Sequence, residues 1–204
     1  MKTKSERFIL GLTLAPLAPL TSLLGGWWLS YALLPEDLIW IGALSGLLLG
    51  ILADFLFLKK LLDRAHQLSI LFWAAVFLFY SIGIFGFFMG VPVFNVGLAI
   101  LAGIVYGARL AARRASLAQV LTMTRRTAGF TTAVLALICI ASAIIASADP
   151  YTAANLEGMF NLSFTVTEAM VIGLIIVGGI GLLVMNWWLA DTVTRFSYMF
   201  FQRA

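Results

Sequence analysis

Residues 129–148 read GFTTAVLALICIASAIIASA, an apolar run of twenty residues without a charged side chain. An α-helix rises about 1.5 Å per residue, so roughly twenty such residues cross the ~30 Å hydrocarbon layer of a bilayer. A membrane β-strand would alternate between apolar and polar residues, and this run does not alternate. The stretch therefore predicts a transmembrane α-helix.

The rest of the chain has the same character. Of its 204 residues 62% are hydrophobic and only 11% are charged, and the mean hydropathy is +1.04. A soluble domain carries about 25% charged residues, so this chain has more apolar surface than a soluble fold hides from water. We predict an all-α, polytopic membrane helix bundle that forms one integral membrane domain over residues 1–204. Six spans are expected, at residues 8–34, 38–58, 69–90, 91–112, 129–148 and 165–190.

The basic residues predict the orientation of these spans. They gather at residues 2–7, 59–64, 109–126 and 195–203. All of these clusters fall on one side of the membrane if six helices are threaded with both termini on that side. Lysine and arginine that flank a span are retained in the cytoplasm. We therefore expect cytoplasmic termini, and we expect the inner membrane of a prokaryote as the location.

Two connections are longer than the others. Residues 149–163 contain Asp149 and Pro150, which suit the start of a helix, so a short extracytoplasmic helix is expected before the last span. Residues 113–127 form either an interfacial helix on anionic lipid headgroups or a solvated cytoplasmic loop. The arginines at the two ends of that connection are Arg113, Arg114, Arg125 and Arg126. Topology already explains these cations, so no nucleic-acid partner is expected.

Small residues recur at every fourth position in two spans. The second span carries Gly42, Gly46 and Gly50, and the fourth carries Gly103 and Gly107. Such stripes let helix backbones approach closely, which favours helix association in lipid. We expect them to pack helices within the chain, against a second copy in a homo-oligomer, or against a partner membrane subunit.

One acidic residue interrupts the apolar second span. Asp54 follows the glycine stripe and precedes Lys59 by just over one turn. Arg109 lies at a comparable depth in the fourth span, so we predict an ion pair between Asp54 and Arg109 at the cytoplasmic end of a contact between these spans. In the alternative, Asp54 titrates as a proton or cation site, because ionisable residues inside membranes often mark transport routes.

The first span contains two prolines in LAPLAPLTS, residues 14–22. Each proline removes a backbone donor, which predicts a kink with free carbonyl groups. Broken membrane helices often line solute sites. The residues that we expect to line a small polar pocket are Pro16, Pro19, Thr13, Tyr80, Ser81 and Asn95.

Few residues suit catalysis. The chain has a single cysteine, Cys139, and a single histidine, His66, which are too few for the usual zinc or haem ligand sets. We therefore predict no catalytic residue, no metal and no cofactor. The favoured function is a small-solute or ion transport component. The alternatives are a non-catalytic structural or regulatory subunit that packs through its glycine stripes, and a membrane-embedded lipid-modifying enzyme.

Overall fold

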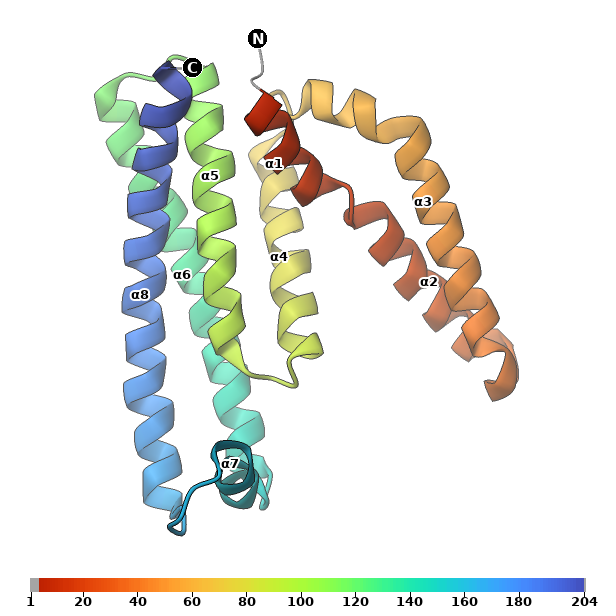
Figure 1. The fold of residues 1–204 in the computed structure, drawn as a ribbon, viewed down its shortest axis with the longest axis vertical. Coiled ribbons are helices and arrows are strands. Elements are labelled where there is room, and N and C mark those ends of the chain that lie inside the picture. Colours follow the sequence, from red (N-terminus) through yellow and green to blue (C-terminus); the bar gives the residue numbers. More distant parts are fainter. Residues whose placement is uncertain (1–3, 204) are drawn as a thin grey trace. The chain divides into compact units, whose positions relative to one another are not determined.

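The computed structural model describes residues 4–203, which are helical with no strand (Figure 1). Six helical stretches in this range are long and apolar enough to cross a membrane. The predicted fold class, an all-α multi-pass membrane protein, is confirmed. Lys2, which belongs to the first basic cluster, lies outside the described residues. The chain divides into two compact units, residues 1–73 and 74–204.

The first unit is a helical hairpin with a broken first arm. The broken arm consists of α1 (Lys4–Leu14) and α2 (Leu17–Leu33), and the second arm is the 26-residue α3 (Ile39–Arg64), preceded by a short 3-10 helix, η1 (Glu36–Leu38). The break falls at Ala15 and Pro16. Pro16 and Pro19 have no N–H to donate to the carbonyls one turn earlier, so two helical hydrogen bonds are lost in this region. The predicted kink in the first span is present.

Close backbone packing joins α2 to α3, which lie side by side in Figure 1. The glycines of the second span that face α2 are Gly42, Gly46 and Gly50. A Cβ atom at Gly46 would collide with the carbonyl oxygen of Ser22, and one at Gly50 would lie 2.5 Å from the carbonyl oxygen of Ala18. Gly26 of α2 meets Gly42 in the same way. The partner of this stripe is therefore the preceding helix.

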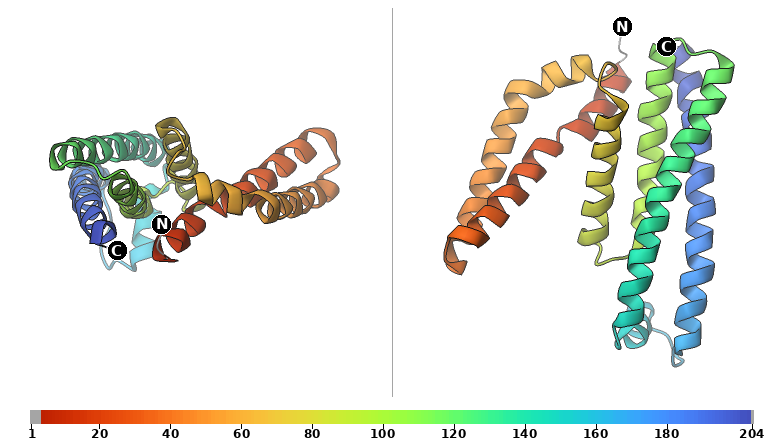
Figure 2. Two further views of the ribbon diagram at one scale, coloured as in Figure 1. Left: turned by 90° about the horizontal axis from the view of Figure 1, so that it is seen from above. Right: turned by 180° about the vertical axis from the view of Figure 1, so that it is seen from behind.

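The second unit contains most of α4 (Ile70–Phe87), a 3-10 helix, η2 (Pro92–Val96), and the helices α5 (Gly97–Ala112), α6 (Leu117–Ala148), α7 (Thr152–Phe160) and α8 (Glu168–Arg203). α8 packs along both α5 and α6 (Figure 2). α7 is the short helix expected before the last span, and it ends at Asn161, which adopts the left-handed conformation that suits a helix terminus.

The glycines of α5 face α8. A Cβ atom at Gly103 would lie 2.9 Å from the Cβ of Val193, and one at Gly107 would lie 2.6 Å from the carbonyl oxygen of Thr194. The sequence analysis placed a close contact between the second and fourth spans. In the structure each of those two stripes is already covered by another helix of its own unit.

The segment of residues 113–127 differs from both expectations. Residues 113–116 form a short turn, and the rest of the segment is neither a separate interfacial helix nor a loop, because it is the start of α6, which runs without interruption from Leu117 to Ala148. Ser116 and Gln119 form a capping box that starts the helix. At 32 residues α6 is about 48 Å long, which exceeds the ~30 Å hydrocarbon layer. The first turns of α6, which carry Arg125 and Arg126, therefore extend the span beyond its apolar part.

Candidate functional site

A cleft opens within the first unit beside the break in the first span. Beyond the glycine contacts with α2, α3 continues for more than three turns toward Arg64, and α1 approaches that end. The cleft has a volume of about 320 Å³. Its lining residues are Arg7 of α1 and, from α3, Asp54, Phe55, Leu58, Lys59, Leu62 and Asp63. The helix break thus separates the part of the hairpin where α2 and α3 pack tightly from the part where α1 and α3 line the cleft.

An ion pair and a second polar contact join α1 to the end of α3. Arg7 Nη2 donates to Asp63 Oδ1 at 2.9 Å, and both side chains are about half exposed. Glu6 contacts His66 in the turn after α3, and both of these side chains are mostly buried. An exposed pair contributes about 0–1 kcal/mol, so the Arg7 pair orients the helices more than it stabilises them. Of these residues, Arg7 and Asp63 line the cleft, and their pair lies at one end of it.

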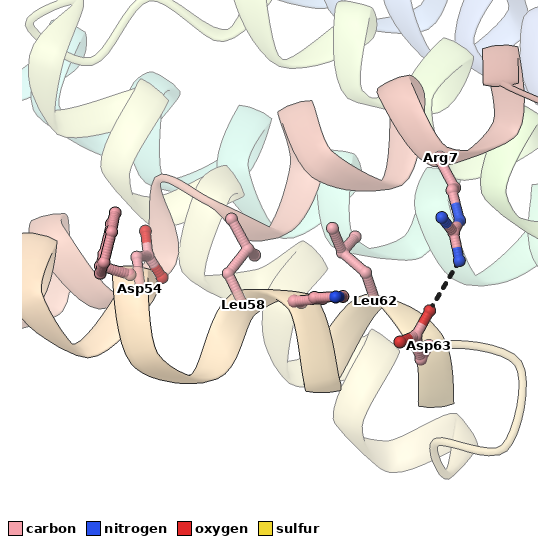
Figure 3. Close-up of a pocket in the computed structure, with 7 residues that line it drawn as sticks. Arg7, Asp54, Leu58, Leu62 and Asp63 are labelled. Atoms are coloured by element: carbon pink, nitrogen blue, oxygen red, sulfur yellow. Dashed lines mark hydrogen bonds and ion pairs between the residues drawn. The ribbon is translucent and has the colours of Figure 1, made fainter.

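The side chains that line the cleft lie in two neighbouring rows of α3. Residues four apart lie on one face of a helix, so Asp54 shares a row with Leu58 and Leu62, and Lys59 shares the next row with Asp63. Figure 3 shows Asp54, Leu58 and Leu62 on the side of α3 that faces α1. The floor of the cleft is therefore apolar, with charged groups at both ends.

Asp54 is the acid at the end of the cleft that is nearer to the glycine contacts of α3. Its side chain is half-buried. Across residues 4–73, the described part of the first unit, its carboxylate makes no hydrogen bond and no ion pair. The arrangement presents a carboxylate to the cleft with its acceptor sites available for a cationic group or a proton.

Arg109, the predicted partner of Asp54, belongs to α5 in the second unit, where it is 7% exposed. The two residues are therefore in different units, and the ion pair stays a prediction. Within its own unit Arg109 lies one turn before Arg113 near the end of α5.

The residues of the predicted polar pocket are also divided between the units. In the first unit Thr13 Oγ1 donates to the carbonyl oxygen of Ile9 at 2.9 Å, which uses the hydroxyl within α1. In the second unit Asn95 Nδ2 donates to the carbonyl oxygen of Ser81 at 2.8 Å, and both residues are buried. Tyr80 packs edge-on against Phe79. Ser81 and Asn95 are brought together, whereas a pocket shared with the proline break stays a prediction.

A buried polar cluster that the sequence analysis missed joins α6 to α8. Asn186 Nδ2 donates to Thr131 Oγ1 at 3.2 Å and to Thr132 Oγ1 at 3.0 Å. Asn186 is only 1% exposed although it lies within an apolar span. A lone asparagine in a span is a usable signal, because its amide requires a partner in lipid. The cluster holds the two longest helices in register.

The described residues contain no group of three His, Cys, Asp or Glu side chains arranged to hold a metal ion. Comparisons of the chain with protein-family models, with curated proteins and with solved structures found no match. The charged cleft around Asp54 is therefore the feature from which a function is inferred.

Proposed function

We propose that this multi-pass membrane protein is a small-solute or ion transport component, in which the cleft binds the solute and Asp54 holds a proton or a cation. The supporting observation is the half-buried Asp54 carboxylate, which lines the cleft without an ion-pair or hydrogen-bond partner among the described residues of its own unit. A charged residue in a span costs roughly 2.5–3.5 kcal/mol at the bilayer centre and less near the interface. An acid kept at such a cost, with no partner in the described part of its unit, favours a binding role over a structural one.

The proposed orientation places the cleft on the cytoplasmic side of an inner membrane. Both termini would be cytoplasmic and α7 would lie outside, because this threading keeps every basic cluster on one side. The arginines that flank the start of α6 are exposed: Arg113, Arg114, Arg125 and Arg126. On the cytoplasmic leaflet each would gain on the order of 1 kcal/mol from anionic headgroups. This lipid contact is part of the proposal.

One observation weighs against the scaffold alternative. A scaffold that recruits partners through its glycine stripes needs those faces uncovered, and α2 and α8 cover them. A homo-oligomer or a partner subunit would then have to use other surfaces.

The proposal is tested by proton flux in proteoliposomes. Vesicles that contain the protein and a pH-sensitive dye are given an inside-negative potassium diffusion potential, and the rate of internal acidification is measured. We expect acidification faster than in protein-free vesicles, and we expect Asp54→Asn to return the rate to the protein-free value. Asp191→Asn is the matched control, because Asp191 is already paired with Arg195 in α8 at 2.9 Å. This substitution should leave the acidification rate unchanged. Equal rates for the parent protein and Asp54→Asn would refute the role of Asp54.

A further inference from the structure

We infer that the cleft binds a small zwitterion, that is, a molecule in which an ammonium group and an anionic group are attached to an apolar part. The inference rests on the proposed function, because it names the chemical class of the solute for the same site. It follows from three properties of the cleft: its charge balance, the order of its lining residues along α3, and its size.

The charge balance comes first. The lining contains two cations, Arg7 and Lys59, and two acids, Asp54 and Asp63. Arg7 and Asp63 already pair with each other, which leaves one carboxylate and one ammonium group to face the cleft. A ligand with a single charge would satisfy one of these groups and desolvate the other without a compensating hydrogen bond. A zwitterion satisfies both.

The order of the lining residues fits the same ligand. Asp54 and Lys59 are five residues apart, which is about 7.5 Å along the helix axis, and the flexible lysine side chain can shorten that distance. Leu58 lies between them in the sequence, and Phe55 and Leu62 also line the cleft. The ammonium group of the ligand would face Asp54, its anionic group would face Lys59, and its apolar part would lie on the leucine floor.

The volume limits the size of the ligand. Small-molecule pockets hold about 300–1,000 Å³, and this cleft, at about 320 Å³, is at the lower end of that range. Two sources of the required chemistry fit such a space. One is a free amino acid with an apolar side chain, and the other is the headgroup of phosphatidylethanolamine with its acyl chains outside the cleft.

The first experiment is titration calorimetry of the full chain in a non-ionic detergent, with leucine and two analogues that each lack one charge. N-acetyl-leucine has no ammonium group, and leucine amide has no carboxylate. We expect leucine to bind and each analogue to bind at least about tenfold more weakly, since each loses a charge-assisted hydrogen bond. Asp54→Asn should weaken leucine binding by about tenfold and leave N-acetyl-leucine unchanged, whereas Asp191→Asn should change neither.

The second arm uses short-chain phosphatidylethanolamine and, as its control, phosphatidylmethanol, which lacks the ammonium group. Binding of phosphatidylethanolamine alone, in an Asp54-dependent manner, would assign the zwitterion to a lipid headgroup. The inference is overturned if neither leucine nor phosphatidylethanolamine binds, or if ligands that lack one charge bind as tightly as the zwitterions. Because the analogues are compared on the unmodified protein, this result does not depend on whether the variants fold.

The outcome separates this inference from the proposed function. Charge-dependent binding of a zwitterion without Asp54-dependent proton flux would support the ligand class and refute the role of Asp54 in proton transport. Asp54-dependent flux without zwitterion binding would support transport and refute the ligand class.

Discussion

Gly26 and its neighbour Gly25 provide a matched test of the close packing between α2 and α3. In Gly26→Ala the added methyl group collides with the carbonyl oxygen of Gly42. The same methyl group would lie 3.1 Å from the carbonyl carbon of Gly42 and 3.2 Å from the Cα of Gly46. These are backbone atoms, which cannot rotate away. Overpacking of this kind costs about 1–3 kcal/mol. In Gly25→Ala the methyl group meets no atom within 4 Å.

Both substitutions gain the same helix propensity, about 0.8–1.0 kcal/mol for glycine to alanine. That gain cancels when the two variants are compared, so we expect Gly26→Ala to be about 1–3 kcal/mol less stable than Gly25→Ala. The assay is the free energy of unfolding in mixed micelles, measured by titration with a denaturing detergent and followed by helical circular dichroism. Equal stability of the two variants would show that α2 and α3 are not in backbone contact at this point.

Three further predictions concern other contacts. Gly107→Ala should be about 1–3 kcal/mol less stable than Gly97→Ala in the same unfolding assay, because only the first methyl group collides with α8; equal values would refute the α5–α8 packing. Asn186→Leu should cost about 1 kcal/mol, since two hydrogen bonds in lipid average roughly 0.6 kcal/mol each, and a neutral effect would contradict the cluster. In a double-mutant cycle of Asp54→Asn and Arg109→Gln in nanodiscs, the cleft proposal expects additivity within about 0.5 kcal/mol; a larger coupling would establish the ion pair and argue against a free carboxylate.

The local pattern of the sequence was sufficient for some features and misleading for others. The two prolines of the first span predicted the break at Pro16 correctly, because a missing backbone donor acts on its own helix. The arginines of residues 113–127 suggested a separate segment, yet α6 starts at Leu117 and continues through Arg125 and Arg126 into the span. Charge tells where the hydrocarbon layer ends, but it does not tell whether the helix ends there, since helical backbone hydrogen bonds also form in turns that are exposed to water.

The cleft illustrates the same limit for a site. Asp54 was recognised from the sequence, because a lone acid in an apolar span is conspicuous. Its neighbour across the cleft, Arg7, lies in another helix, and the contact between Glu6 and His66 joins residues that are sixty positions apart. The sequence identifies His66 only as the sole histidine, and the structure places it against Glu6 of α1.

The sequence by itself determined that the chain is a six-span helical membrane protein. A bilayer imposes that result one segment at a time, through the length and the polarity of each apolar run. Only the tertiary structure decided which helix covers each glycine stripe and which groups surround Asp54. Four-residue spacing defines a face of small residues but carries no information on the opposite helix. That pairing arises from shape complementarity between helix faces, here between the consecutive helices α2 and α3 and between α5 and α8, which are distant in the chain.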